Sequence, residues 1–242
     1  SLARRARPEN DVVVATIFVN PKQFGPNEDF AAYPRNYQHD LDLFEREKVD
    51  MVFMPTVDEI YPAGFDTYVT VGDLTKRLEG ASRPGHFVGV ATVVAKLFNL
   101  VQPTRAYFGE KDAQQLRVIS KIVKDLAFDL EIVPCPTVRE PDGLAMSSRN
   151  AYLDPEQRKA ATVLFRSLSL AKQKLAGGEL DAEKLRRAML DLINAEPLAT
   201  IDYVSIADSD TLEELSEISG TALASMSVRI GKTRLIDNMV LR

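Results

Sequence analysis

Two hydroxyls and a guanidinium stand side by side at Ser147-Ser148-Arg149, within the run from Asp142 to Asn150. An arginine presents a planar fork of N–H donors that matches phosphate oxygens, and the serines add short neutral donors beside it. Gly143 precedes them and supplies backbone freedom, while Asp154-Pro155-Glu156 predicts a helix start with an N-cap, a first-turn proline and an early acid. We interpret this segment as a mobile loop suited to a polyphosphate, with a polar surface turn as the alternative.

A second candidate site begins at Gly109, between a predicted strand and a predicted helix. Glycine there lets backbone N–H groups approach an anion or a sugar closely, and Lys111 adds a positive charge for phosphate. Asp112 can accept from ribose hydroxyls, and Gln115, one helical turn beyond Lys111, is predicted to face the same side. The alternative is that acids in a first helical turn are favoured by the helix dipole without any ligand.

Two amides follow the first predicted strand, and a histidine lies in a later loop. Asn20 and Gln23 present neutral donors and acceptors to a small polar molecule, or else cap the turn at Pro21. His86 favours a hydrogen-bonded structural role over a catalytic one, and His39 is predicted to lie on an exposed helix face. No set of Cys, His and acids has metal-ligand spacing, so a divalent metal is expected to arrive with a nucleotide.

The composition excludes several classes of protein. The chain has 242 residues, 45% of them apolar, and 30 basic against 35 acidic side chains give a net charge of −5. The sequence contains no basic block that would track a nucleic acid, and no apolar stretch reaches the length of a membrane span. The single cysteine, Cys135, cannot form an intrachain disulfide, which fits a reducing cytoplasm.

The periodicity of apolar residues predicts an α/β fold with a doubly wound parallel sheet in residues 1–137. The segment Asp11–Val19 is nearly continuous in apolar residues, which is typical of a strand buried on both faces. The other predicted strands are Asp50–Met54, Thr67–Val71, Arg105–Phe108 and Asp129–Val133, and the predicted helices between them are Tyr37–Lys48, Gly89–Leu100 and Lys111–Leu126.

Residues 138–242 predict a smaller α+β domain. Two helical segments, Asp154–Ala176 and Asp181–Ala195, are separated by Gly177-Gly178. Strand-like alternation follows at Ile201–Ile206, Ala222–Ile230 and, after a Gly231-Lys232 turn, Thr233–Ile236.

Taken together, several motifs in order resemble the pantothenate synthetase family over essentially the whole chain. They are Phe18–Phe24, Tyr33-Pro34-Arg35, Arg83–Phe87, Phe108–Gln115, Ala145–Asn150 and the closing Thr233–Asn238. The resemblance implies a Rossmann-like nucleotidylyltransferase domain with a parallel sheet and a C-terminal α+β lid domain. It further implies a cytoplasmic, homodimeric ligase of pantothenate (coenzyme A) biosynthesis, which uses ATP with Mg²⁺ to join pantoate to β-alanine through a pantoyl adenylate, releasing pyrophosphate and then AMP.

The same resemblance implies a role for each matching residue. Gln23 and Gln115 would hold pantoate, Gln23 would also lie near the incoming amine of β-alanine, and Asn20 and Tyr33 would lie nearby. The nucleotide would be bound by Gly109, Glu110, Lys111, Asp112, Val138, Met146, Ser147, Ser148 and Arg149, with Val138 lining the adenine pocket. Lys111, Ser147, Ser148 and Arg149 would act in catalysis, and no residue is assigned as a metal ligand.

The resemblance also implies a His-x-Gly-His-type signature just before the segment that begins here as Ser1-Leu2, and the printed sequence contains none. Those histidines would bind the triphosphate, so we expect the printed chain neither to adenylate pantoate nor to bind ATP tightly. Two alternatives follow: another nucleotidylyltransferase acting on a different acid or a phosphorylated alcohol, or a catalytically impaired nucleotide-binding module.

Overall fold

The computed structural model describes residues 1–26 and 28–242, which form two compact units. The first unit holds Ser1–Lys76, Arg83–Glu110 and Gln115–Pro136. The second unit holds Thr137–Arg242 together with two short earlier segments, Arg77–Ser82 and Lys111–Gln114. The mixed α/β class predicted from the sequence is confirmed.

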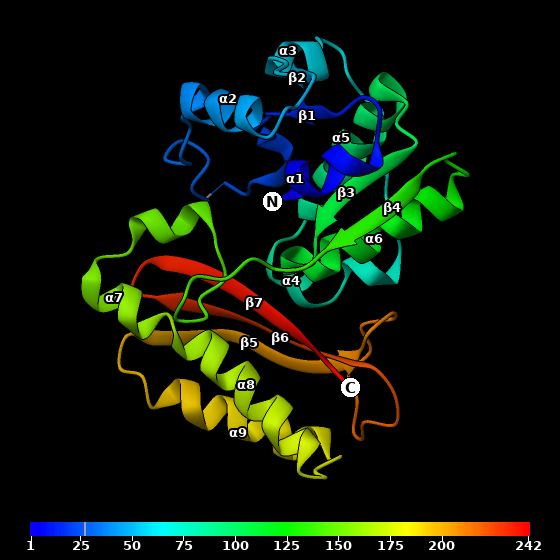
Figure 1. Cartoon of the computed structure of the whole chain (residues 1–242). Coiled ribbons are helices and arrows are strands. Elements are labelled where there is room, and N and C mark those ends of the chain that lie inside the picture. Colours follow the sequence, from blue (N-terminus) through cyan, green and yellow to red (C-terminus); the bar gives the residue numbers. More distant parts are fainter. Residues whose placement is uncertain (27) are drawn as a thin grey trace. The chain divides into compact units, whose positions relative to one another are not determined.

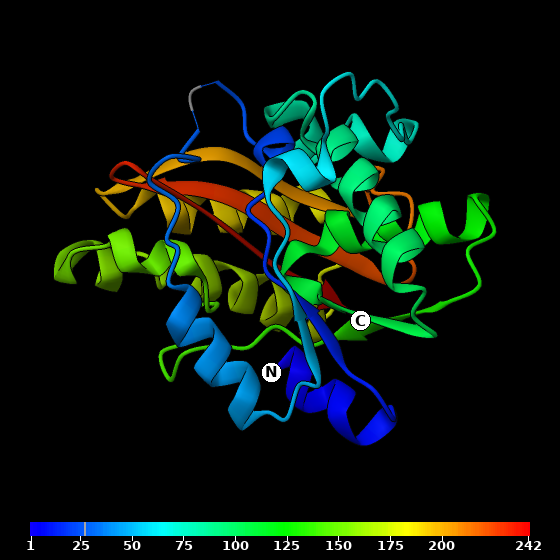
Figure 2. The ribbon, with the colours of Figure 1, turned by 90° about the horizontal axis from the view of Figure 1, so that it is seen from above.

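The strands of the first unit form two parallel pairs. Strand β1 (Val14–Thr16) pairs with β2 (Met51–Phe53), and β3 (Arg105–Gly109) pairs with β4 (Glu131–Cys135) (Figure 1). Helix α1 (Leu2–Ala6) and the 3₁₀ turn η1 (Arg7–Glu9) precede β1. The segments between the strands contain helices α2 (Tyr37–Arg46), α3 (Val57–Ile60), α5 (His86–Val101) and α6 (Ala113–Asp125) and the 3₁₀ turns η2 (Pro21–Gln23), η3 (Asp73–Thr75) and η4 (Glu110–Asp112). An Arg4–Glu47 ion pair ties α1 to the residue that follows α2. The ribbons of α1 (dark blue) and α2 (blue) can be followed in Figure 2.

Three predictions for the first unit are wrong in detail. The predicted strand over Asp11–Val19 is a strand only at Val14–Thr16, and Val12 is 57% exposed rather than buried on both faces. The segment Thr67–Val71 forms no strand, because the Val69 N–H donates to the Thr92 hydroxyl at 3.0 Å instead of to a strand carbonyl. Within the described chain, the two parallel pairs are separate and not one continuous doubly wound sheet.

Helix α5 organises the core of the first unit. Its face bearing Val90, Val94 and Phe98 is buried, and it packs in one cluster with the buried side chains Ile119 and Ile122 of α6. A helix that is apolar over most of its circumference is suited to such burial. The prediction of this helix is confirmed. Helix α5 also contacts η2, the turn that follows β1.

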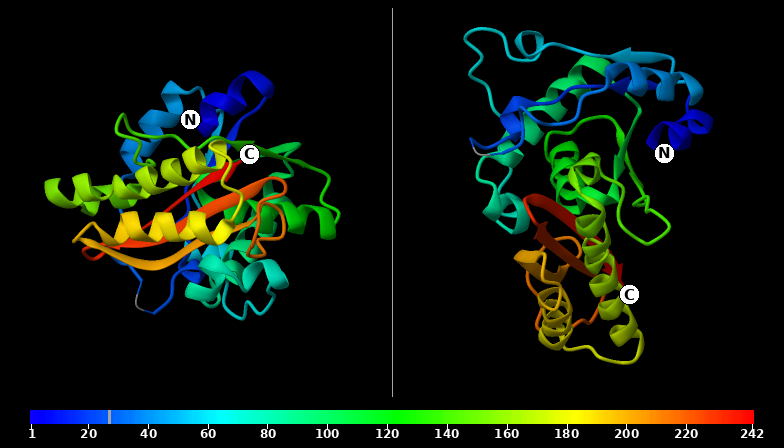
Figure 3. Two further views of the ribbon diagram at one scale, coloured as in Figure 1. Left: turned by 90° about the horizontal axis from the view of Figure 1, so that it is seen from below. Right: turned by 90° about the vertical axis from the view of Figure 1, so that its left-hand side faces the viewer.

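The second unit is a three-stranded antiparallel sheet with helices on one face. Its order is β5 (Ala199–Asp208), β6 (Ala222–Ile230) and β7 (Thr233–Leu241), and α8 (Val163–Ala176) and α9 (Ala182–Asn194) run along it (Figure 3). The unit also contains α4 (Leu78–Ser82), η5 (Ser148–Tyr152) and α7 (Pro155–Ala160). Eight of the nine β6 residues are buried, as expected for a central strand. The predicted Gly231-Lys232 turn is confirmed as the two-residue link from β6 to β7.

The predicted helix over Asp154–Ala176 is divided into α7 and α8. The break falls at Ala161-Thr162, where the Thr162 hydroxyl donates to the Lys159 carbonyl at 2.8 Å. Such a local side-chain bond offers the backbone an alternative to the helical pattern, so the turn tightens there.

Among the described helices, none is both long and apolar enough to cross a membrane.

Candidate active site

The turn after β1 is built around Asn20, whose side chain is 3% exposed. Its Oδ1 accepts from the Lys22 N–H at 3.2 Å and the Tyr61 hydroxyl at 2.9 Å. Its Nδ2 donates to Gln23 Oε1 at 2.9 Å and to the Gly89 carbonyl at 3.1 Å. All the hydrogen-bonding groups of this amide therefore have protein partners, and Asn20 holds the turn and orients Gln23. Burial raises the pKa of the Tyr61 phenol to about 12, so this hydroxyl stays a donor.

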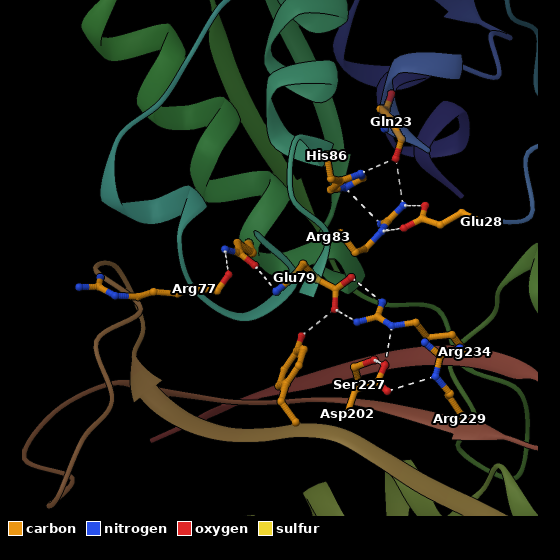
Figure 4. A network of polar contacts seen from close by, with 12 residues as sticks. Gln23, Glu28, Arg77, Glu79, Arg83, His86, Asp202, Ser227, Arg229 and Arg234 are labelled. Carbon is orange, nitrogen blue, oxygen red and sulfur yellow. Dashed lines mark hydrogen bonds and ion pairs between the residues drawn. The ribbon is translucent and has the colours of Figure 1, made fainter. Parts of the chain in front are cut away.

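Gln23 is held at its backbone carbonyl and at its side-chain Oε1, and its amide nitrogen differs from both. Its carbonyl accepts from His86 Nδ1 at 2.9 Å and from Arg83 at 3.1 Å, and Arg83 also forks onto Glu28 at 2.7 and 2.6 Å (Figure 4). His86 thus has the hydrogen-bonded role that the sequence favoured. Burial raises the pKa of the Glu28 carboxyl, but the hydrogen bonds and charge of Arg83 outweigh it and hold that pKa below its ordinary value. The Gln23 amide nitrogen has no hydrogen-bond partner among residues 1–26 and 28–242.

A glycine of α5 sets the position of this turn. A Cβ on Gly89 would lie 2.1 Å from the Lys22 carbonyl oxygen and 2.9 Å from the Gln23 nitrogen. Only a residue without a side chain allows the helix and the turn to approach this closely.

A narrow pocket of the second unit gathers several residues singled out by their chemistry. Lys111, Ser147 and Arg149 all line it, together with Leu144, Ala145, Asn150, Leu164, Arg234, Leu235, Ile236 and Asp237. The Lys111 ammonium makes no ion pair with any residue that the structure describes. The pocket therefore presents a cation without a fixed counter-ion, which is suited to an anionic ligand.

The loop bearing the serines, which the sequence predicts to be mobile, has contacts that hold both of its ends. Gly143 has φ +92°, but a Cβ there would lie 2.0 Å from the Phe165 ring, so this glycine allows close packing and is not an open hinge. Asp142 accepts from Arg158 at 2.6 and 3.0 Å, and these hydrogen bonds lower the pKa of its carboxyl.

Beyond that turn, the chain enters two capped helical segments. Ser147 caps η5, because its Oγ accepts from the Arg149 N–H at 3.3 Å, which leaves the serine O–H able to donate. The predicted helix start is confirmed: Asp154 and Gln157 form a capping box, with Pro155 at the first helical position.

Two exposed apolar side chains lie next to each other at the base of this loop. The Met146 N–H donates to the Val138 carbonyl at 2.9 Å, beside a bridge between Arg139 and Ala145. The side chains of Val138 and Met146 are 41% and 52% exposed. An apolar pair beside a cationic pocket is suited to the flat face of a base.

One buried acceptor in this pocket lacks a partner. Asn150 donates through Nδ2 to the Ala145 carbonyl at 3.1 Å, while its buried Oδ1 has no hydrogen-bond partner in the described chain. A buried acceptor left unpaired is costly, so such a group is a place for a donor supplied by a ligand or a water.

A polar network in the second unit holds Arg234 at the pocket. Arg234 forks onto the buried Glu79 at 2.7 Å and donates to Asp202 at 2.7 Å, and the Tyr203 hydroxyl donates to Glu79 at 3.0 Å (Figure 4). Burial disfavours the charge on Arg234, yet the hydrogen bonds and charge of Glu79 outweigh it and raise its pKa. Two carboxylates thus neutralise Arg234, and Lys111 keeps its charge for a ligand.

Comparison with known proteins identifies the family. The family model described as Pantoate-beta-alanine ligase matches residues 1–240. A pantothenate synthetase of Roseiflexus sp. (strain RS-1) is 61% identical over 241 residues, covering 100% of this chain and 87% of that protein. The crystal structure of pantothenate synthetase from Thermus thermophilus is 51% identical with a TM-score of 0.96, covering 98% of this chain and 86% of that one. The chain belongs to the pantoate–β-alanine ligase family.

A more distant member of the family has been solved with ligands. The pantoate–β-alanine ligase of Francisella tularensis, described as complexed with beta-gamma ATP and β-alanine, is 34% identical with a TM-score of 0.79. The alignment covers 99% of this chain and 83% of that chain.

The other residues to which the family resemblance assigns a role lie in different surroundings. A Cβ on Gly109 would meet no atom within 4 Å, so internal packing does not require a glycine there. Glu110 and Lys111 lie in the 3₁₀ turn η4, so the α-helical spacing that predicted Lys111 and Gln115 on one side does not apply. Asp112 is exposed, and the ring of Tyr33 packs edge-on against Phe24 at 5.7 Å.

The adjacent glutamines of α6 show what the sequence could not distinguish. Gln114 is 5% exposed, and its side chain bonds the Glu79 N–H at 3.0 Å and the Arg77 carbonyl at 2.8 Å. Gln115 is half-buried, and its amide has no partner among the residues that the structure describes. Sequence reasoning assigned no role to Glu79, Asn150, Arg234 or Asp237. Asn150 lay in the motif that contains Arg149, and Arg234 and Asp237 lay in the closing motif Thr233–Asn238, whereas no quoted motif contained Glu79.

Proposed function

We propose that this chain catalyses the ATP-dependent condensation of pantoate with β-alanine to pantothenate, AMP and pyrophosphate. The expectation that the printed chain lacks this activity is the alternative, and the exchange test below decides between the two. Membership of the family supports the reaction. The observation that carries the assignment of residues is the pocket shared by Lys111, Ser147 and Arg149, in which Lys111 has no counter-ion among the described residues.

In the first half-reaction, the pantoate carboxylate attacks the α-phosphorus of ATP and pyrophosphate departs. Negative charge builds on the leaving group, and Lys111 and Arg149 are the positive groups proposed to stabilise it. The hydroxyls of Ser147 and Ser148 would follow the phosphates as neutral donors. Gly109, Glu110 and Asp112 would complete the nucleotide contacts, with Val138 and Met146 against adenine.

Pantoate is proposed to be held by Gln23 and Gln115, whose half-buried amides keep hydrogen-bonding groups that no described residue uses. Neutral amides bind a carboxylate and hydroxyls without neutralising the nucleophile. Asn20 would act by orienting Gln23, with Tyr33 nearby.

In the second half-reaction a neutral β-alanine amine attacks the acyl carbon of the adenylate, and AMP leaves. Positioning carries this step, since the mixed anhydride is already activated.

We also propose that ATP is used with Mg²⁺. The described residues include no group of three or more His, Cys, Asp or Glu side chains that could hold a metal ion. Among the described residues that line the pocket, the one carboxylate is Asp237, which is paired with Arg139. Mg²⁺ would therefore be bound through phosphate oxygens of the nucleotide, as is usual for magnesium at nucleotide sites.

A homodimeric state and a cytoplasmic location are proposed from the resemblance to the family. Light scattering on the purified chain tests the first, and a mass twice that of the 26.9 kDa chain is expected.

The test of function is isotope exchange between pyrophosphate and ATP, with and without pantoate, followed by product analysis with β-alanine. Pantoate-dependent exchange and formation of pantothenate support the ligase. Exchange with another acid but not with pantoate indicates a different nucleotidylyltransferase. Binding of ATP without exchange indicates the impaired nucleotide-binding module.

A further inference from the structure

We propose that Asp237 and Asn238 of β7 are positioning residues that hold Lys111 and the serine loop together at the nucleotide site. This inference rests on the proposed function for its kinetic consequences, but its geometry stands on contacts within the second unit alone.

Asn238 holds the backbone of the candidate cation. Its Nδ2 donates to the Lys111 carbonyl at 2.8 Å, and the residue is 8% exposed. Lys111 lies in a short 3₁₀ turn, where few hydrogen bonds of the helix itself fix the backbone. A bond from β7, which pairs with β6 along its whole length, therefore fixes the backbone position from which the Lys111 side chain extends.

Asp237 holds the other wall of the same pocket. Its carboxylate, 1% exposed, accepts from Arg139 at 2.7 and 2.9 Å and from the Asn238 N–H at 2.8 Å. Arg139 in turn donates to the Gly143 carbonyl at 3.0 Å and the Asn238 carbonyl at 3.2 Å. One dipeptide thus fixes both the turn that precedes Ser147 and the backbone of Lys111.

The charges point to positioning and not to direct binding. Arg139 fully neutralises Asp237, and a carboxylate facing a phosphate would repel it. The Asn238 amide nitrogen donates to the Lys111 carbonyl. Removal of the Asn238 side chain therefore alters the position of Lys111 and leaves the charge of the pocket unchanged.

The experiment compares Asn238→Ala with Asn99→Ala in the full chain. Asn99 donates to the Ala95 carbonyl at 3.0 Å on α5, so the control removes the same kind of bond outside the pocket. We expect Asn238→Ala to raise the KM for ATP about tenfold with little change in the KM for pantoate, the size expected for one lost hydrogen bond. Asn99→Ala is expected to change neither constant.

Two further measurements distinguish failure of this inference from failure of the proposed function. In a Lys111→Ala background, Asn238→Ala is expected to cause no further loss, and an equal additional loss overturns the inference. The acylation rate of the Lys111 amine, followed by mass spectrometry, needs no turnover. We expect Asn238→Ala to change this rate several-fold and Asn99→Ala to leave it unchanged. If the wild type lacks ligase activity, the labelling result alone decides, and an unchanged rate overturns the positioning role.

Discussion

The Asn20–Gln23 turn and the Lys111 pocket differ in how far their polar and charged groups are paired within the protein. In the turn, every polar group of the Asn20 side chain has a protein partner, and the Gln23 amide nitrogen has none in the part of the chain that the structure describes. In the pocket, a lysine lacks a counter-ion and a buried Asn150 oxygen lacks a donor among the described residues. A neutral turn whose hydrogen-bonding groups have protein partners is suited to orienting a small acid. A pocket with an unpaired cation is suited to stabilising the negative charge that develops on a leaving group. The difference predicts that stability and catalysis separate between the two regions.

The largest expected effect is on activity, from Lys111→Ala. Loss of this cation should lower kcat/KM for ATP by about 10²- to 10³-fold, the usual range for removing one group that stabilises transition-state charge. Because the ammonium makes no ion pair among the described residues, the free energy of unfolding should change by less than about 0.5 kcal/mol.

Steady-state kinetics and denaturant titration measure these two quantities for Lys111→Ala. Lys121→Ala, which breaks an exposed pair with Asp125, is the matched control and should leave kcat/KM unchanged. A large loss of stability in Lys111→Ala would show that the lysine side chain stabilises the fold, which contradicts the prediction.

The next largest effect is expected on stability, from Gly89→Ala. The added Cβ would meet the Lys22 carbonyl at 2.1 Å, so the turn must move, at a cost of about 1–3 kcal/mol, which exceeds the gain in helix propensity. Gly109→Ala is the control, since its Cβ meets nothing within 4 Å and should leave unfolding unchanged while weakening ATP binding. Chemical denaturation and calorimetric ATP titration test both, and equal stabilities would contradict the close approach.

The paired glutamines sharpen the comparison. Gln115→Ala should raise the KM for pantoate about tenfold without a change in stability, because its amide has no protein partner among the described residues. Gln114→Ala should instead lower stability by about 1–2 kcal/mol, since it leaves the Glu79 N–H and the Arg77 carbonyl unpaired. Steady-state kinetics and thermal unfolding of both variants test this prediction. A loss of stability in Gln115→Ala with a raised KM for pantoate in Gln114→Ala would contradict it.

The smallest effect concerns Glu28. Its pKa is lowered in the folded state, so its contribution to stability is present above the unfolded value near 4.3 and is lost as pH falls through the folded value. Glu28→Gln should therefore be less stable than wild type at pH 7 by about 1 kcal/mol or less, and the difference should shrink on acidification. Denaturation midpoints from pH 7 to pH 3 measure this, with Glu45→Gln as the control.

Local patterns predicted much of the fold. The apolar run of α5, the helix start at Asp154 and the Gly231-Lys232 turn are each set by neighbours within a few residues, and each is confirmed. Thr67–Val71 failed, since strand formation needs a partner whose position lies outside the segment. The sequence also does not show that Phe165 packs against Gly143, where a Cβ would lie 2.0 Å from the Phe165 ring.

The sequence by itself determined the family, the α/β class and which residue types could act on phosphates, because these depend on composition, periodicity and motifs. Only the tertiary structure decided which of two adjacent glutamines is open, and that Asn238 holds Lys111 from 127 residues away. Likewise, it alone showed that Glu79 and Arg234, 155 residues apart, neutralise each other. Hydrogen bonds and ion pairs act over a few ångströms of space, and separation along the chain carries no record of them.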